Sequence, residues 1–227
     1  MSPRPTAVVT GASRGIGRAI AKRLAERYDI VAVARSAREL DTLVKEIEGA
    51  GGGCRPLTLD VTDSAAVERA LSGVDADVLV NNAGVGTLRP LLELTLDDWK
   101  RMVDVNFNAL FYVTRALLPG MVERNSGFIV NIGSLAGRSS FVGGACYAAT
   151  KHAVVGFSES LMLEVRDANV RVSVIMPGSV DTDFSARRTG ASWKLAAEEV
   201  AEAMWYVVTQ PARALVSRIE MRPAKTK

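Results

Sequence analysis

Tyr147 and Lys151 are four residues apart. On a helix this spacing puts both side chains on one face, with Cβ atoms about 5–6 Å apart. An ammonium group beside a phenol favours the phenolate, so this neighbour should lower the tyrosine pKa from its usual value of about 10. Such a tyrosine can act as the acid or the base in hydride chemistry on a carbonyl or an alcohol. Because any long helix can contain this spacing, its meaning depends on the rest of the chain.

A glycine-rich segment near the N-terminus indicates a dinucleotide site. Gly11, Gly15 and Gly17 directly follow the apolar run Ala7–Thr10 and open an amphipathic segment. In a strand–turn–helix unit, glycines allow a tight turn and a close approach of backbone to a pyrophosphate, which the free N–H groups of the helix N-terminus bind. The alternative is a helix-start turn in which the glycines serve packing alone. The strand and helix signals around the turn favour the dinucleotide site.

The residue after the second apolar run indicates which dinucleotide binds. A free ribose 2′-hydroxyl is usually met there by Asp or Glu, and a 2′-phosphate by Arg. This chain has Arg35 there, and Arg14 lies inside the glycine turn. Two guanidinium groups can hold a dianionic phosphate through charge-assisted hydrogen bonds. We therefore expect NADP(H) in preference to NAD(H), the alternative being that both arginines are solvated surface charges.

The apolar pattern indicates the scaffold that positions these residues. Short runs dense in Val, Ile and Leu alternate with longer amphipathic segments, as in strands buried on both faces of a parallel sheet. The predicted strands are 7–10, 30–34, 54–59, 78–81, 128–132, 171–176 and 214–219. The predicted helices lie near 15–27, 37–49, 64–72, 96–123, 147–168 and 197–209. The pattern predicts an α/β fold with a doubly wound (Rossmann) parallel sheet of about seven strands and helices on both faces.

The organisation of the chain predicts one domain over residues 1–227. The chain has no linker, internal repeat or low-complexity segment, and its length suffices for one sizeable core. The longest irregular stretch is 178–196, and we expect a short substrate loop at about 183–197.

Composition and charge argue against several classes of protein. The net charge of +3 is too small to indicate nucleic-acid binding, and we interpret the basic end 222–227 as a solvated terminus. Cys54 and Cys146 form no CxxC pair, and the single histidine, His152, rules out a multi-histidine metal site. No apolar run reaches about 18 residues and the N-terminus lacks an apolar signal core. We expect no metal, no membrane contact and a cytoplasmic protein.

Further motifs follow the predicted strands in order. Asp60-Val61 follows the third strand, Asn81-Asn-Ala-Gly84 the fourth, Ser134 the fifth and Pro177-Gly-Ser-Val-Asp-Thr182 the sixth. Together with the glycine turn, Tyr147 and Lys151, these motifs resemble the short-chain dehydrogenase/reductase family, in its small single-domain branch. The resemblance runs from Thr10 to about Thr182, and the ordered set is far more specific than any one motif.

The resemblance implies catalytic roles for four residues. Tyr147 would pass a proton to or from the substrate oxygen, and Ser134 would orient that oxygen. Lys151 would lower the Tyr147 pKa and bind the nicotinamide ribose, and Asn106 would hold a water that links Lys151 to solvent. Taken singly, each has a plainer interpretation: a half-buried tyrosine, the end of a strand, a solvated lysine and a locally bonded helix residue.

The resemblance also implies the cofactor contacts. The expected cofactor-binding residues are Gly11, Ser13, Arg14, Gly15, Ile16, Gly17, Arg35, Asp60, Val61, Asn82, Ala83, Gly84, Tyr147, Lys151, Pro177, Gly178, Val180 and Thr182.

The expected function is NADPH-dependent reduction of a ketone, an aldehyde or a 3-oxoacyl group, reversible as alcohol oxidation. One alternative is an NADP-dependent dehydrogenase of a hydroxy acid or polyol, and another is a dinucleotide-binding regulator without catalysis. Three aromatic residues can form an apolar substrate wall or simply cover the core: Phe141, Phe184 and Trp193. Three cations of the loop are either solvated charges or a site for an anionic substrate: Arg187, Arg188 and Lys194.

Two long predicted helices, near 96–123 and 147–168, indicate assembly. They carry more apolar side chains than one sheet face needs, namely Ala109, Phe111, Leu117, Phe157, Leu161 and Leu163. The resemblance implies pairing through these helices, so we expect a homodimer or a homotetramer.

Overall fold

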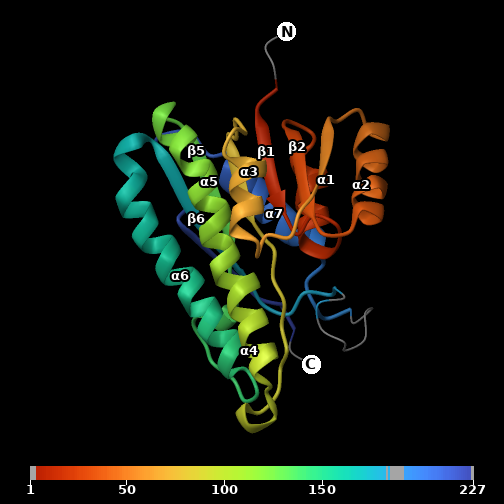
Figure 1. The fold of residues 1–227 in the computed structure, drawn as a ribbon, viewed down its shortest axis with the longest axis vertical. Coiled ribbons are helices and arrows are strands. Elements are labelled where there is room, and N and C mark those ends of the chain that lie inside the picture. The colour runs from red at the N-terminus through yellow and green to blue at the C-terminus, as the bar shows by residue number, and fades with distance from the viewer. Residues whose placement is uncertain (1–3, 183, 185–191, 226–227) are drawn as a thin grey trace.

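A computed structural model describes residues 4–182, 184 and 192–225 of the chain. Its strands form a seven-stranded parallel sheet in the order β3-β2-β1-β4-β5-β6-β7 (Figure 1). The strands are β1 Thr6–Thr10, β2 Asp29–Ala34, β3 Cys54–Thr58, β4 Val78–Asn81, β5 Gly127–Ile132, β6 Val170–Pro177 and β7 Arg218–Met221. The predicted doubly wound α/β fold is confirmed.

Helices cover both faces of this sheet. They are α1 Gly15–Leu24, α2 Ala37–Gly49, α3 Ser64–Leu71, α4 Leu96–Val103, α5 Ala109–Glu123, α6 Ala145–Val165 and α7 Ala197–Val208. Apolar side chains of α1, α2 and α7 pack with the strands in one buried cluster, and those of α3, α5 and α6 pack in another. The inner strands β1, β2, β4, β5 and β6 are buried for this reason, as their continuous apolar runs predict, whereas the edge strands β3 and β7 are partly exposed.

The edge of the sheet explains one exception to the apolar pattern. β3 contains Pro56 and pairs only with β2, so the missing N–H of the proline costs no bond inside the sheet. The order of the strands reverses beside β1, which lies between β2 and β4. In open α/β sheets, ligands bind outside the carboxyl ends of the strands at this point of reversal.

Two sequence predictions were wrong in detail. The helix expected over 96–123 is interrupted by a π-helical turn, η2 Asp104–Asn108, which separates α4 from α5. The last strand, expected at 214–219, is β7 at Arg218–Met221. Ala214 instead belongs to a turn, in which its N–H donates to the carbonyl of Pro211 at 2.8 Å.

No helix in the described ranges is both long and apolar enough to cross a membrane. The same ranges contain no group of three or more His, Cys, Asp or Glu residues that could hold a metal ion.

Candidate active site

The glycine turn between β1 and α1 has the backbone that its sequence predicts. Gly11 and Gly15 have φ values of +65° and +54°, in the left-handed region that favours glycine. A Cβ atom on Gly17 would lie 2.3 Å from the carbonyl oxygen of Gly11, closer than any side chain allows. Each glycine is therefore required by the turn, either for its φ angle or for the close contact of its backbone.

The turn is tied to the end of β4. The Thr10 hydroxyl accepts hydrogen bonds from the backbone N–H groups of Asn82 and Ala83, at 3.0 and 3.1 Å. The Asn82 side-chain amide donates in turn to the carbonyls of Thr10 and Gly11, at 3.0 and 3.2 Å. Asn82 thus fixes the backbone on which a dinucleotide would lie.

Arg14 and Arg35 lie at one end of a large pocket, of about 1750 Å³, that opens at this edge of the sheet. Both side chains are exposed, and neither forms a hydrogen bond or ion pair within the part of the chain that the structure describes. Asp60 lies nearby after β3. A hydrogen bond from the Thr62 backbone, with a smaller effect of the Arg35 charge, holds the Asp60 pKa below its usual value against the effect of burial. This end of the pocket therefore presents two free guanidinium groups.

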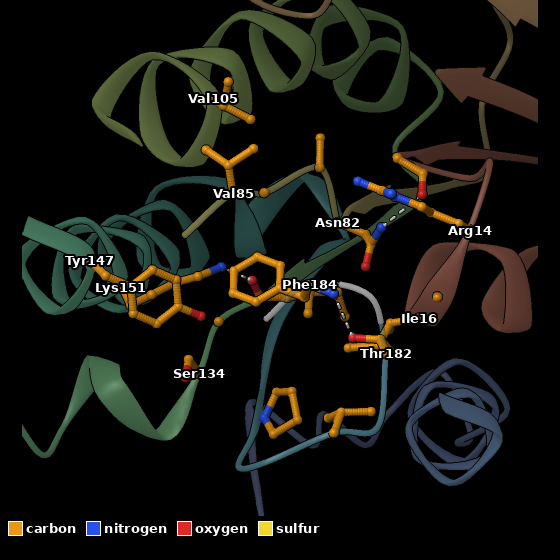
Figure 2. A pocket seen from close by; sticks show the side chains of 18 of the residues that line it. Arg14, Ile16, Asn82, Val85, Val105, Ser134, Tyr147, Lys151, Thr182 and Phe184 are labelled. Atoms are coloured by element: carbon orange, nitrogen blue, oxygen red, sulfur yellow. Dashed lines mark hydrogen bonds between the residues drawn. The ribbon is translucent and has the colours of Figure 1, made fainter. Parts of the chain in front are cut away.

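Ser134, Tyr147 and Lys151 lie together at the other end of the pocket, from the segment after β5 and from α6 (Figure 2). Lys151 is only 5% exposed, and its ammonium donates to the Ile132 carbonyl at 2.9 Å. Burial lowers the Lys151 pKa to about 8. Lys151 therefore exchanges its proton close to neutral pH.

The pKa of Tyr147 corrects one expectation. We expected Lys151 to lower it, but burial raises the Tyr147 pKa, and only a side-chain hydrogen bond with Ser134 lowers it in part. The Lys151 nitrogen lies 5.9 Å from the centre of the tyrosine ring and bonds to the main chain, so burial outweighs its charge. The protein alone holds Tyr147 as a phenol.

Asn106 is buried in the π-helical turn η2 and is fully engaged. Its side-chain oxygen accepts from the Val85 N–H at 2.7 Å, and its amide donates to the Val85 carbonyl and the Thr150 hydroxyl at 2.9 and 3.0 Å. Such π-helical turns are frequent at functional sites. The side chain joins the segment after β4 to α6, and the expected water between Asn106 and Lys151 stays a prediction.

The segment Pro177–Thr182, which follows β6, closes the pocket over the sheet edge. The Gly178 N–H donates to the Met221 carbonyl at 2.8 Å, and a Cβ on Gly15 would lie 3.3 Å from the Thr182 methyl group. Val180 pairs with Leu195 as a β-bridge, which returns the chain to this segment after the substrate loop. This segment, which contains several expected cofactor-binding residues, and the glycine turn are therefore neighbours.

Aromatic side chains line the pocket around Tyr147. Phe141, Phe184 and Trp193 all contribute to the lining, as the apolar-wall hypothesis predicts. The Phe184 ring lies 5.7 Å from the Tyr147 ring, between Tyr147 and Thr182 in Figure 2. Arg187 and Arg188 lie outside the described residues, and Lys194 forms an ion pair with Asp181 at 3.6 Å.

The pocket collects nearly every residue that the sequence singled out. Of the predicted cofactor and catalytic residues, Gly17 and Asn106 lie behind the lining, and all the others form part of it. Lining residues without a motif were not predicted, among them the apolar Val85 and Val105, which lie in the upper part of Figure 2. Arg222, Pro223 and Lys225 also line the pocket, although residues 222–227 were interpreted only as a solvated terminus.

Comparisons with known proteins agree with this geometry. Residues 5–192 match the family described as short chain dehydrogenase. The NADP-dependent 3-hydroxy acid dehydrogenase YdfG of Salmonella typhi is 40% identical, covering 95% of this chain and 94% of its own. The serine 3-dehydrogenase of Rhizobium radiobacter is 34% identical, covering 96% of this chain and 93% of its own. The closed form of serine dehydrogenase complexed with NADP+ superposes with a TM-score of 0.88 at 37% identity, covering 95% of this chain and 94% of that one.

Proposed function

The chain belongs to the short-chain dehydrogenase/reductase family and is an NADP-dependent oxidoreductase, and from this premise we propose that it oxidises a small 3-hydroxy acid. The observation that carries the proposal is the pocket itself, with Ser134, Tyr147 and Lys151 at one end and, at the other, two guanidinium groups that have no partner among the described residues. Relatives that span almost the whole chain act, by their names, on 3-hydroxy acids and on serine, which carries its hydroxyl on the same carbon.

The residues of the pocket fit NADP(H). The glycine turn packs tightly on itself at Gly17, where a Cβ would clash with the Gly11 carbonyl oxygen, and α1 begins at Gly15 with free N–H groups for a pyrophosphate. Arg14 and Arg35 supply two forked donors for a 2′-phosphate, and no acidic residue stands at position 35 to repel it. Thr182 and the backbone of Val180 would hold the nicotinamide end.

The chemistry is divided between cofactor and protein. NADP(H) supplies the hydride acceptor or donor. Ser134 would hold the substrate hydroxyl. Tyr147, after its own proton has left through Lys151, would take the hydroxyl proton as the carbon loses hydride. Lys151, whose pKa of about 8 is suited to proton exchange near neutral pH, would carry charge beside Tyr147 and bond the ribose. The balanced reaction converts a 3-hydroxy acid and NADP+ into a 3-oxo acid, NADPH and a proton.

A substrate panel tests this proposal. We expect wild-type enzyme with NADP+ to show a higher kcat/KM for 3-hydroxybutyrate than for neutral secondary alcohols and polyols, and a higher kcat/KM than it shows in reduction of a 3-oxoacyl thioester with NADPH. A preference of tenfold or more for a neutral alcohol or the thioester would contradict the 3-hydroxy acid assignment. Tight NADPH binding without turnover of any compound would point to the regulatory alternative.

We also propose that the protein forms a homodimer or homotetramer through the α4–α5 and α6 surface. Phe111 and Leu163 are 44% and 61% exposed there, and Trp99 adds a third exposed apolar side chain. Ala109, Leu117 and Leu161, which we expected to contribute, are buried in this chain's own core. Sedimentation that gives only monomer would contradict the assembly. The cytoplasmic location stays a prediction.

A further inference from the structure

The C-terminal segment after β7 lies at the catalytic end of the pocket. β7 is parallel to β6, so the carboxyl ends of both strands lie on the same side of the sheet, and Met221 is paired with Pro177. Pro223 then lies beside Gly178, because a Cβ on Gly178 would be 3.3 Å from the Pro223 side chain and 3.0 Å from the Leu135 side chain. Leu135 is the neighbour of Ser134, so the tail passes close to the residue proposed to hold the substrate oxygen. Figure 1 shows the C-terminus at the edge of the sheet opposite the N-terminus.

The tail adds two positive charges to the lining of the pocket. Arg222 and Lys225 are exposed and line the pocket together with Ser134 and Leu135. Glu220 is the carboxylate that faces them, and it pairs with both Arg138, at 2.5 Å, and Arg222, at 3.2 Å. One carboxylate is thus shared by two guanidinium groups. By contrast, Lys194, on the loop side of the pocket, has Asp181 at 3.6 Å.

We propose that Arg222 and Lys225 form a carboxylate-binding site that selects an acidic substrate over a neutral one. This inference rests on the proposed function, because the carboxylate is that of the 3-hydroxy acid whose hydroxyl lies at Ser134 and Tyr147. The aromatic wall of Phe141 and Trp193 offers a carboxylate no charge complement. Arg222 directly precedes Pro223, which lies beside Gly178 as Leu135 does, and Lys225 lines the same pocket. These two cations therefore offer the charge complement that a substrate carboxylate needs.

The test compares an acid with its own ester, so that only the charge of the substrate changes. We would measure kcat and KM for 3-hydroxybutyrate and methyl 3-hydroxybutyrate with NADP+, in wild type and in an Arg222→Gln/Lys225→Gln double variant. Since the two side chains are exposed, each contributes modestly, and we expect the acid-to-ester ratio of kcat/KM to fall about tenfold in the double variant. The fall should come from KM for the acid, because a binding contact is lost. Lys45→Gln, on the exposed face of α2 and outside the pocket, is the matched control and should keep the wild-type ratio.

The outcomes separate this inference from the proposed function. A wild-type enzyme that oxidises the acid, with a double variant that keeps the same acid-to-ester ratio, overturns the carboxylate site alone. A wild-type enzyme that oxidises neither compound overturns both proposals. A double variant whose KM rises for NADP+ and not for the acid assigns the tail to the cofactor and also overturns the site. A Lys225→Arg variant that keeps most of the wild-type ratio supports it, since the charge is retained.

Discussion

Tyr147 and Lys151 are held in a part of the pocket where burial disfavours both of their charged forms. Burial raises the pKa of the phenol and lowers that of the ammonium to about 8. The pair is therefore not a preformed phenolate–ammonium pair in the protein alone. Instead, Lys151 can gain and lose its proton near neutral pH, which suits a residue that relays a proton to a catalytic phenol.

Burial of Lys151 also has a cost in stability. Because its pKa in the folded protein lies below the usual 10.5, the folded state is penalised while the ammonium is charged, below about pH 8. This pKa difference corresponds to a penalty of about 3 kcal/mol in the free energy of unfolding at pH 7. A variant without the ammonium escapes this penalty but also loses the hydrogen bond to the Ile132 carbonyl, which costs it about 1 kcal/mol. Lys151→Met should therefore be inactive yet more stable than wild type at pH 7, by about 1–2 kcal/mol.

Urea unfolding at pH 7 and pH 10 measures this effect. As pH rises from 8 towards 10.5 the wild type sheds its penalty, so the advantage of Lys151→Met should shrink. Lys45→Met, at an exposed position, should show no such pH-dependent difference. Two results would contradict the penalty from the buried charge. One is a Lys151→Met protein that is less stable than wild type at pH 7, and the other is a stability difference between variant and wild type that is the same at pH 7 and pH 10.

At the residue scale, we expect Arg35 to decide the choice of dinucleotide. Arg35→Asp replaces a donor for the 2′-phosphate with a charge that repels it, so KM for NADP+ should rise about 10- to 100-fold, while KM for NAD+ falls. Arg69→Asp, on α3 outside the pocket, makes the same change of charge and should leave both values near wild type. Unchanged NADP+ affinity in Arg35→Asp would contradict the proposal that this residue binds the 2′-phosphate.

The glycine turn shows how one element of structure fixes a site. Gly17→Ala would place a methyl group 2.3 Å from the Gly11 carbonyl oxygen and 2.4 Å from the Asn82 amide, so the turn must shift. We expect at least a tenfold loss of NADPH affinity, measured by fluorescence titration, and a loss of about 1–3 kcal/mol of stability.

Gly49→Ala is the matched control for this element. A Cβ there, at the end of α2, meets nothing within 4 Å, and alanine is favoured over glycine in a helix. This variant should bind NADPH as wild type does. Equal NADPH affinity in the Gly17 and Gly49 variants would show that the turn does not shape the cofactor site.

The elements that the sequence could predict are those with a local signal. The strands have continuous apolar runs, and Gly11 and Gly15 need φ angles that only their own residue type adopts easily. The π-helical turn at Asn106 has no such signal, because it arises from tertiary bonds to Val85 and Thr150. The same is true of the Lys151 pKa, which depends on what surrounds the residue and not on its spacing from Tyr147.

At the scale of the whole molecule, the pocket is built from residues far apart in the sequence. The parallel sheet brings the ends of β1, β2, β4, β5, β6 and β7 to one edge, so motifs spread from Gly11 to Thr182 meet there. The order of these motifs was enough to predict the lining residues at the ends of the strands and at Tyr147 and Lys151. Arg222 and Lys225 are exposed, as expected of a solvated end, but only the pairing of β7 with β6 shows that this end lies beside the pocket; residues 226–227 lie outside the described residues.

The central claim is that this molecule oxidises a 3-hydroxy acid with NADP+ by passing the hydroxyl proton to Tyr147. The most direct test is the single-turnover rate of NADPH formation from 3-hydroxybutyrate in Tyr147→Phe, with Tyr206→Phe, an exposed tyrosine of α7, as the matched control. Loss of the proton acceptor should slow Tyr147→Phe about 10²- to 10⁴-fold while NADPH binding is retained, and Tyr206→Phe should match wild type. A Tyr147→Phe enzyme that forms NADPH at the wild-type rate would contradict the account.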